Sequence, residues 1–342
     1  MNETFDKNDI KIAVLGGGTG SFMVVSALKK YTKQLAAIVN MVDDGGSTGV
    51  LRDEFGTLPP GDVRQCLVAL SDSPKVRALF NYRFDSGVMD GHSFGNILLT
   101  ALEKMTGNFS EAVETASEIL RIDGMVIPAT LDNIRLKMEW PEASTIINGE
   151  REIDAKYFKY DPRRANLSLF PSASANPMAL KAIEQADMVV IAPGDLYTSA
   201  GPLLIIDGIA EALQKTKAVC VYACNLVTKQ GQTTNFSVSD HVNEIERFAG
   251  VRFVDYVLYN QQVPSKDILK RYKKEKAYLV KVDTEAIAKA RYKAIGCNLL
   301  GEIVKPINAE KLPVTRQLIR HDGDALAKAL LNVYNNEISK TL

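Results

Sequence analysis

The chain has 342 residues, of which 46% are hydrophobic and 24% are charged, as is ordinary for a globular protein. Its 41 basic and 41 acidic residues cancel, so no overall field draws it to nucleic acid or to an anionic membrane. Four cysteines and three histidines show no metal-ligand spacing, and no apolar run reaches the roughly 18 residues of a membrane span. We therefore expect a cytoplasmic protein without a structural metal, a nucleic-acid partner or a membrane span.

Short apolar runs alternate with helical patterns along most of the chain, which predicts parallel strands joined by crossover helices. The expected strands are 12–15, 35–42, 188–192, 218–223 and 251–259. The expected helices are 21–30, one ending near 214, 239–248 with Ser239 as its cap, 266–276 and 324–338. We expect a single Rossmann-like α/β/α domain over residues 1–342, with a mostly parallel sheet and flexible residues 1–10.

One segment, at about residues 145–165, interrupts this rhythm. Its sequence STIINGEREIDAKYF alternates apolar and polar residues as strands do, and Asn148-Gly149 is a favourable hairpin turn. We expect a small antiparallel excursion here, at an edge of the structure.

The first loop of the expected sheet is rich in glycine. It runs from Gly16 to Ser21, between a strand and a helix, where glycines allow close backbone approach and the helix start offers free N–H groups to an anion. The predicted phosphate-binding residues are Gly17, Gly18, Thr19 and Gly20. Ser21 stands where a dinucleotide-binding fingerprint has its third glycine, and no Lys-Ser/Thr pair follows as in an ATP-binding P-loop. The loop therefore identifies neither NAD nor ATP as the ligand.

A second polar loop follows the second expected strand. Asp43 and Asp44 are placed to meet a ribose hydroxyl or to bind a divalent cation through oxygen, and Gly46 and Ser47 belong to a run suited to an anion nest. A solvated turn is the alternative interpretation of the same residues.

Further candidates lie between residues 52 and 96. Asp62, in the stretch LPPGDVR, is either a helix cap or a catalytic or cation-binding group, while Arg52 and Arg64 are candidate phosphate partners. In HSFGN, His92 and Asn96 flank a helix start that either binds a ligand or is simply capped.

The remaining candidates follow later strands. Asp195 lies in the loop PGDLYTSAGP, and Asn225 and Asn260 each end a strand at the edge where open α/β sheets bind ligands. In the triple that starts at Arg320, Asp322 is a helix cap, whereas Arg320 and His321 are free to reach a phosphate.

Five stretches together resemble one family: IAVLGGGTGS, VNMVDDGGSTGVLRDEFGTLPPGDVRQCLVAL, HSFGN, APGDLYTS and IRHD. They are similar to the CofD-like proteins and, within them, to the bacterial gluconeogenesis-factor (YvcK-type) branch. The resemblance covers about residues 10–330 and implies a Rossmann-like sheet. It maps the family's nucleotide site onto Gly17, Gly18, Thr19, Gly20, Asp43, Asp44, Asn225 and Arg320, with a looser match at Tyr272.

The resemblance implies two functions. The gluconeogenesis-factor branch is associated with growth on gluconeogenic carbon sources, cell shape and peptidoglycan precursor supply, and with binding UDP-sugars such as UDP-N-acetylglucosamine. Kinship with 2-phospho-L-lactate transferase implies instead the transfer of a phospholactyl group from a guanosine diphosphate donor to a deazaflavin, with Mg²⁺.

Both functions stay open at this point, because the shared loops serve either one. The leading hypothesis is a UDP-sugar-binding regulator without turnover, whose partners include proteins of cell-wall metabolism and further copies of itself. The alternative is a phospholactyl transferase with Mg²⁺ as cofactor. A third interpretation, an NAD-dependent dehydrogenase, is weakened by Ser21 and by the lack of a proton-relay histidine. No residue is assigned a catalytic role.

Overall fold

The structure, a computed structural model, describes residues 10–301 and 319–341. The expectation of a flexible N-terminal stretch therefore falls almost wholly outside the described residues. Among the described helices, none combines the length and the apolar character needed to span a membrane.

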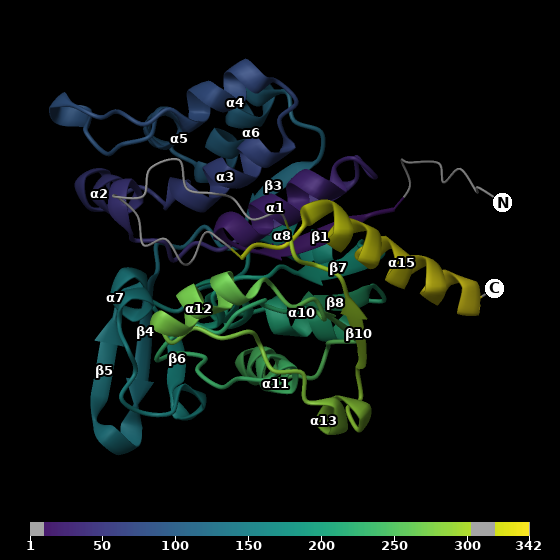
Figure 1. The fold of residues 1–342 in the computed structure, drawn as a ribbon. Coiled ribbons are helices and arrows are strands. Elements are labelled where there is room, and N and C mark those ends of the chain that lie inside the picture. The colour runs from purple at the N-terminus through teal and green to yellow at the C-terminus, as the bar shows by residue number, and fades with distance from the viewer. Residues whose placement is uncertain (1–9, 302–318, 342) are drawn as a thin grey trace.

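A seven-stranded parallel sheet forms the centre of the fold (Figure 1). Its order is β10-β9-β8-β7-β1-β2-β3, so the chain winds outward from β1 in one direction and then, from β7, in the other. The strands are β1 (Ile12–Gly16), β2 (Leu35–Val39), β3 (Met125–Pro128), β7 (Met188–Ile191), β8 (Val219–Ala223), β9 (Tyr256–Asn260) and β10 (Lys293–Cys297). This order and the parallel pairing confirm the predicted Rossmann-like class.

Helices cover both faces of the sheet, and each face has its own hydrophobic core. Alternate residues of β1 divide between the cores: Ile12 and Val14 face one, Ala13 and Leu15 the other. The first core lies under α1 (Gly18–Leu28), α3 (Pro60–Leu70), α5 (Phe94–Thr106), α6 (Phe109–Leu120), α12 (Lys266–Lys274) and α15 (Gly323–Thr341). The second lies under α8 (Pro177–Glu184), α9 (Gly201–Leu204), α10 (Ile209–Lys215) and α11 (Val238–Ala249).

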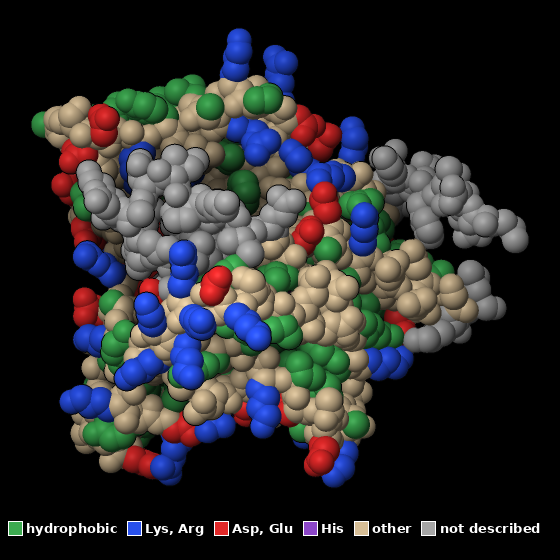
Figure 2. Space-filling model, viewed as in Figure 1, with side chains coloured by type: hydrophobic (Ala, Val, Ile, Leu, Met, Phe, Trp, Pro, Cys, Tyr) green, Lys and Arg blue, Asp and Glu red, His purple; other side chains and the backbone are tan. Residues whose placement is uncertain are grey.

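Shorter helices occupy the connections. They are α2 (Gly46–Phe55), α4 (Pro74–Asn81), the 3-10 turn η1 (Gly87–Met89) and α13 (Thr284–Ala288). Figure 2 shows the face that carries α12, over which Lys and Arg side chains gather.

The antiparallel excursion is present, but it is larger than expected and differently built. Its three strands, in the order β5-β4-β6, are β4 (Arg135–Trp140), β5 (Thr145–Asn148) and β6 (Asn166–Phe170). The predicted hairpin turn at Asn148-Gly149 is wrong: Gly149 has φ +91° and is the N-cap of the helix α7 (Glu150–Ala155) instead. The chain reverses between β4 and β5 through a 3-10 turn at Pro141–Ala143. The alternation of apolar and polar residues over 150–159 resembles that of a strand. It carries no information about the tertiary contacts that hold α7 as a helix.

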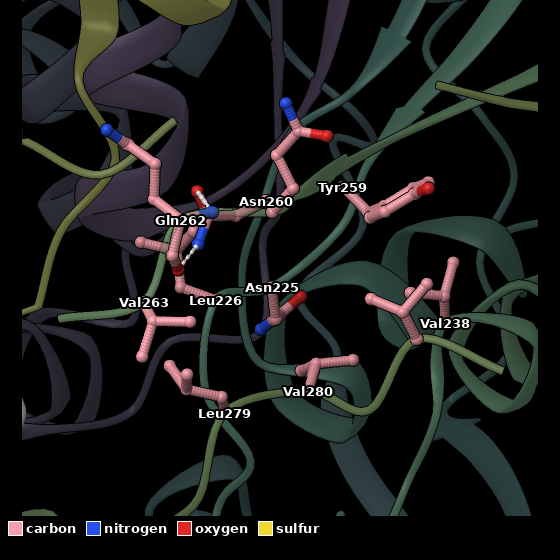
Figure 3. A pocket seen from close by; sticks show the side chains of 11 residues that line it. Asn225, Leu226, Val238, Tyr259, Asn260, Gln262, Val263, Leu279 and Val280 are labelled. Atoms are coloured by element: carbon pink, nitrogen blue, oxygen red, sulfur yellow. Dashed lines mark hydrogen bonds between the residues drawn. The ribbon is translucent and has the colours of Figure 1, made fainter. Parts of the chain in front are cut away.

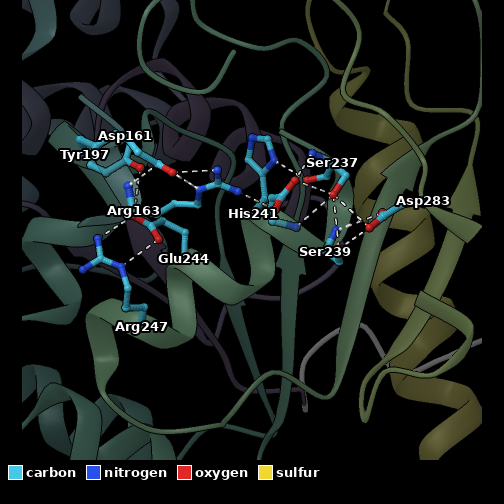
Figure 4. Close-up of polar contacts among 10 residues, drawn as sticks. Asp161, Arg163, Tyr197, Ser237, Ser239, His241, Glu244, Arg247 and Asp283 are labelled. Atoms are coloured by element: carbon cyan, nitrogen blue, oxygen red, sulfur yellow. Dashed lines mark hydrogen bonds and ion pairs between the residues drawn. The ribbon is translucent and has the colours of Figure 1, made fainter. Parts of the chain in front are cut away.

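Other boundaries shift in ways that local chemistry explains. α1 begins at Gly18 and not near Ser21, so the glycine loop supplies the first turn of the helix. The cap of α11 is Ser237 rather than Ser239, because Ser237 and Asp240 form a reciprocal capping box (Figure 4). After β7 the chain makes a π-helical turn, η4 (Leu196–Ala200), before α9 and α10.

Candidate functional site

The candidate site lies at the carboxyl ends of β1 and β7, where the direction of winding reverses. The loop after β1 and the loop after β7 touch here: a Cβ built on Gly20 would lie 1.6 Å from the carbonyl oxygen of Pro193. Only a residue without a side chain allows this approach. In doubly wound sheets the crevice at such a reversal is the usual ligand position.

The glycine loop presents the N-terminus of α1 to this crevice. Gly17 is the N-cap of this eleven-residue helix and has no side chain with which to cap it. Gly18 has φ +62° and open space where a Cβ would stand, while Thr19 is exposed. The four predicted phosphate-binding residues are thus together at a helix start, which is the geometry that holds an anion.

A half-buried carboxyl group lies directly beside this loop. Asp62, in the first turn of α3, accepts a hydrogen bond from the backbone of Gly18, and its Oδ2 would lie 2.4 Å from a Cβ on Gly17. Burial, reinforced by the charge of Asp43, raises the pKa of Asp62 to about 7. Asp62 is therefore part of the loop's immediate surroundings and not merely a helix cap.

Asp43 approaches the same place from the end of β2. Its Oδ2 would lie 2.5 Å from a Cβ on Gly61, and its Oδ1 accepts the amide of Gly45 at 3.0 Å. Burial raises the pKa of Asp43 as well. Two carboxyl groups with raised pKa thus border the glycine loop, and an anion there requires their protonation or a counter-cation.

Asp44 points elsewhere, to the start of α7. Its carboxylate accepts the amides of Glu150 and Arg151 at 3.1 and 2.8 Å. Asp44 and the N-terminal turn of α7 therefore form a cap between two distant segments. Asp43 and Asp44, expected to act together, have different partners.

The cap brings Glu150 toward the site, a residue that sequence analysis missed. Burial raises the pKa of Glu150 to about 8, and the nearby charges of Asp43, Asp154 and Asp44 add to this shift. Only the position of α7 could have identified it, because EREID reads as an ordinary solvated stretch.

Residues of the loop DDGGSTG and of the stretch HSFGN are joined in one chain of hydrogen bonds. The Ser47 hydroxyl lies 3.0 Å from Nδ1 of His92 and accepts from Nδ2 of Asn96 at 3.3 Å. Asn96 Oδ1 in turn accepts from Nε of Arg64 at 2.9 Å. Gly46, at the exposed start of α2, precedes Ser47. The structure thus joins DDGGSTG, HSFGN and Arg64 beside the carboxyl pair.

Asp195 is held by a lysine that sequence analysis also missed. Lys229 Nζ lies 2.6 Å from Asp195 and 2.5 Å from Asp154 at the end of α7. Gln232 Nε2 donates to the carbonyl of Ile153, at the same end of the helix, at 2.8 Å. Asp44 and Lys229 therefore fix α7 at both of its ends.

Asn225 bonds to the loop after β7 and also lines a neighbouring cavity, whose lining residues are drawn in Figure 3. Its Nδ2 donates to the carbonyl of Gly194 at 2.7 Å, and its Oδ1 accepts from the Tyr222 hydroxyl at 3.0 Å. It also lines a cavity of about 330 Å³ at the carboxyl ends of β8 and β9. Asn260 and Gln262 give this cavity polar groups, while its apolar wall is formed by Leu226, Val238, Leu279, Val280 and Val282.

A buried polar network supports the loop after β7 from behind (Figure 4). The Tyr197 hydroxyl donates to Glu244 at 2.9 Å, and Arg247 pairs with the same carboxylate at 2.6 Å. Arg247 also donates to the carbonyl of Ala165, just before β6, at 3.0 Å. The network joins η4, α11 and the small sheet, and these contacts restrain the position of the loop that bears Asp195.

Comparison with known proteins decides the family. The family model described as 2-phospho-L-lactate transferase CofD matches residues 12–300. The chain belongs to the CofD family. Gluconeogenesis factors from Bacillus subtilis and Halalkalibacterium halodurans are 35% and 38% identical to it, each over 94% of this chain and over 98% and 95% of their own lengths.

A crystal structure of a Bacillus halodurans protein has the same fold. It superposes with a TM-score of 0.84 at 35% identity, covering 94% of this chain and 99% of that one. Within the CofD family, the chain therefore falls in the gluconeogenesis-factor branch.

The candidate residues near the C-terminus make their described contacts away from the glycine loop. Arg320 is exposed, and only its backbone carbonyl makes a described hydrogen bond, from the amide of Gly301. His321, expected to be free, is not: its Nε2 lies 3.0 Å from the carbonyl of Cys224, and burial lowers its pKa to about 4. Tyr272 is buried, and its hydroxyl accepts the amide of Ile319. Asp322 caps α15 through the amide of Ala325, as expected.

Arg52 is also corrected by the structure. Its guanidinium is buried and donates to the backbone carbonyls of Asp43 and Ile134 and to Oδ1 of Asn133. Burial lowers the pKa of Arg52 to about 10. These donors join the second loop to the segment just before β4, so Arg52 is a structural residue of this CofD-family site and not a phosphate partner.

Proposed function

We propose that this CofD-family protein is a cytoplasmic nucleotide-sugar-binding regulator whose ligand is of the UDP-N-acetylglucosamine type. In this proposal it acts in growth on gluconeogenic carbon sources, in cell shape and in peptidoglycan precursor supply, with protein partners in cell-wall metabolism. The gluconeogenesis factors to which it is similar support the first of these roles through their names.

One observation carries the proposal: a helix start suited to phosphate and a polar cavity lie on the same rim, joined by one residue. Asn225 bonds to Gly194, in the loop that faces the glycine loop, and also lines the cavity. A ligand with phosphates at one end and a base or sugar at the other matches this pair of environments. Such a ligand needs only ground-state binding to act as a signal.

The carboxyl pair supports a second candidate, a phospholactyl transferase. Mg²⁺ is usually bound by one or two carboxylates together with substrate phosphates. Among the described residues no three His, Cys, Asp or Glu side chains are grouped to hold a metal ion, but Asp43 and Asp62 suit this shared mode. There Mg²⁺ would neutralise phosphate charge, while a carboxyl group with a pKa near 7 is suited to accept a proton from an attacking hydroxyl.

A binding and turnover experiment separates the two candidates. The protein is screened by thermal shift against UDP-N-acetylglucosamine, guanosine diphosphate and NAD, because a ligand at 100 times its Kd stabilises the fold by about 2.7 kcal/mol. The bound nucleotide is then recovered after long incubation with Mg²⁺, with and without a deazaflavin acceptor. We expect intact UDP-sugar in stoichiometric amount.

Two controls make the result decisive. Gly18→Val changes a position with open space and positive φ, so it should keep the fold and lose nucleotide binding. Release of nucleoside monophosphate that disappears in Asp62→Ala would contradict the regulator and support the transferase. Stabilisation by NAD alone would contradict both.

A further inference from the structure

Helix α12 concentrates positive charge on a chain whose formal net charge is zero. Residues 266–276 carry six cations against two acids, Asp267 and Glu275. All six cations are exposed: Lys266, Lys270, Arg271, Lys273, Lys274 and Lys276. They lie where Figure 2 shows blue side chains gathered over α12, and a local field of one sign projects from this surface.

The opposite face of α12 is packed into the core. Ile268 and Tyr272 are 7% and 2% exposed, and the Tyr272 hydroxyl bonds to the amide of Ile319. The apolar face is therefore unavailable for insertion into lipid. The cations are presented outward by an element with a fixed orientation.

The fold gains little from these charges. No ion pair between described residues involves a cation of α12. Lys266, Lys270 and Lys274 repeat at the four-residue spacing at which like charges destabilise a helix. The helix dipole favours Arg271, Lys273 and Lys274 in the last turn, but it gives no reason for Lys266 and Lys270.

The position of α12 relates it to the nucleotide site. The segments that join it to the rest of the fold both line the 330 Å³ cavity, through Val263 before the helix and Leu279 after it. The glycine loop, in contrast, lies beside the carboxyl group of Asp62, to which Asp43 is a close neighbour. An anionic ligand therefore meets carboxyl groups near its binding loop and a strongly basic surface at the border of the cavity.

We propose that α12 is the electrostatic guide of the nucleotide site: its exposed cations draw the phosphates of an anionic nucleotide to the rim. The inference rests on the proposed function and adds a kinetic role to it. Steering of this kind acts on the rate of association and weakens with salt, because the Debye length falls from about 10 Å at 0.1 M to about 3 Å at 1 M.

The test is stopped-flow binding of a fluorescent UDP derivative to the full chain, from about 20 mM to about 1 M NaCl. The variant combines Lys270→Glu, Lys273→Glu and Lys274→Glu. The control, with the same charge change, combines Lys181→Glu, Lys215→Glu and Lys217→Glu, at exposed positions on segments that lead to the amino ends of β7 and β8. Glutamine at the three α12 positions removes the charge without reversing it, should the first variant fold poorly.

We expect the α12 variant to associate about tenfold more slowly at the lowest salt, with a dissociation rate changed less than about twofold. The difference should vanish near 1 M salt, and the control should match the unsubstituted protein. Unchanged association with normal binding overturns this inference alone, as does a loss that persists at high salt or appears equally in the control. If the unsubstituted protein binds neither the UDP derivative nor competing UDP-N-acetylglucosamine, the proposed function and the inference fail together.

Discussion

The carboxylate of Asp62 fills the space in which Gly17 would carry a side chain. A Cβ on Gly17 would lie 2.4 Å from Oδ2 of Asp62, so the two motifs GGGTG and PPGD fit each other at this contact. The acid also accepts the hydrogen bond from Gly18, which places a titrating group at the helix start proposed to bind phosphate.

We expect Asp62→Asn to raise the melting temperature, and to raise it more at about pH 8 than at about pH 5. The pKa of Asp62 rises from 3.8 to about 7 on folding, because the carboxyl is buried, so the folded protein keeps a proton that the unfolded chain releases. The stability from this group is complete below about pH 4 and is lost as the pH rises through about 7. The substituted amide oxygen can still accept from Gly18. Thermal melts at the two pH values measure the effect.

Asp72→Asn is the control for that experiment. Asp72 is exposed, and its hydrogen bond with Lys29 lowers its pKa, so the sign is opposite: its contribution is present at high pH and is lost on acidification. An equal gain for Asp62→Asn at both pH values would refute a raised pKa in the folded state.

Gly20→Ala should destabilise the protein far more than Gly18→Ala. A Cβ at Gly20 would collide with the carbonyl oxygen of Pro193, forcing the loops after β1 and β7 apart, at a cost of about 3 kcal/mol. At Gly18 the space is open, and the positive φ alone costs about 1–2 kcal/mol. Urea unfolding of the two variants gives both values. Similar losses would mean that the loops separate without strain.

Arg52→Met should cost about 3 kcal/mol of unfolding free energy, because it leaves buried carbonyl groups of Asp43 and Ile134 without their donor. Arg135→Met is the matched control, since Arg135 is partly exposed and its ion pairs with Asp53 and Asp44 are worth about 1 kcal/mol or less. Chemical denaturation compares the two. A stable Arg52→Met protein with weakened nucleotide binding would restore Arg52 as a ligand residue.

Lys229→Met should loosen α7 without unfolding the protein. It removes the cation that joins Asp154 to Asp195 and leaves two partly buried carboxylates facing each other. We expect hydrogen exchange of residues 150–156 to accelerate about tenfold, while the β1 and β7 amides keep their protection. Lys156→Met removes only an exposed pair with Glu152 and should change nothing. Equal exchange in both variants would mean that Lys229 does not anchor the helix.

Local sequence signals were sufficient for the first loop and for five of the seven parallel strands, whereas the two edge strands β3 and β10 were not predicted. The strand runs around Val14, Ile38 and Val190 are short, apolar and bounded by turn residues, so periodicity alone finds them. Gly18 has positive φ and Gly20 lies against another backbone, and both demands can be read from a glycine-rich strand-to-helix junction.

The part of the site formed by α7 and its partners could not be predicted from local sequence signals. Glu150 and Lys229 lie in stretches that look solvated, and they enter the site only because Asp44 and Asp195 hold α7 in place. Arg52 has the residue type of a phosphate ligand, yet carbonyl groups far along the chain use its donors. Hydrogen bonds and ion pairs between residues so far apart in the sequence produce no periodic pattern of residue types.

The small sheet and α7 form a part of the site that can change in length independently of the parallel sheet. The loops after β1, β2 and β7 belong to the parallel sheet and can change little without disturbing its register. The wall that faces them belongs to a single insertion between β3 and β7, attached through Asp44, Arg52 and Lys229. Lengthening or shortening that segment would therefore change the surroundings of Asp44 and Asp195 while the glycine loop stays fixed on the parallel sheet.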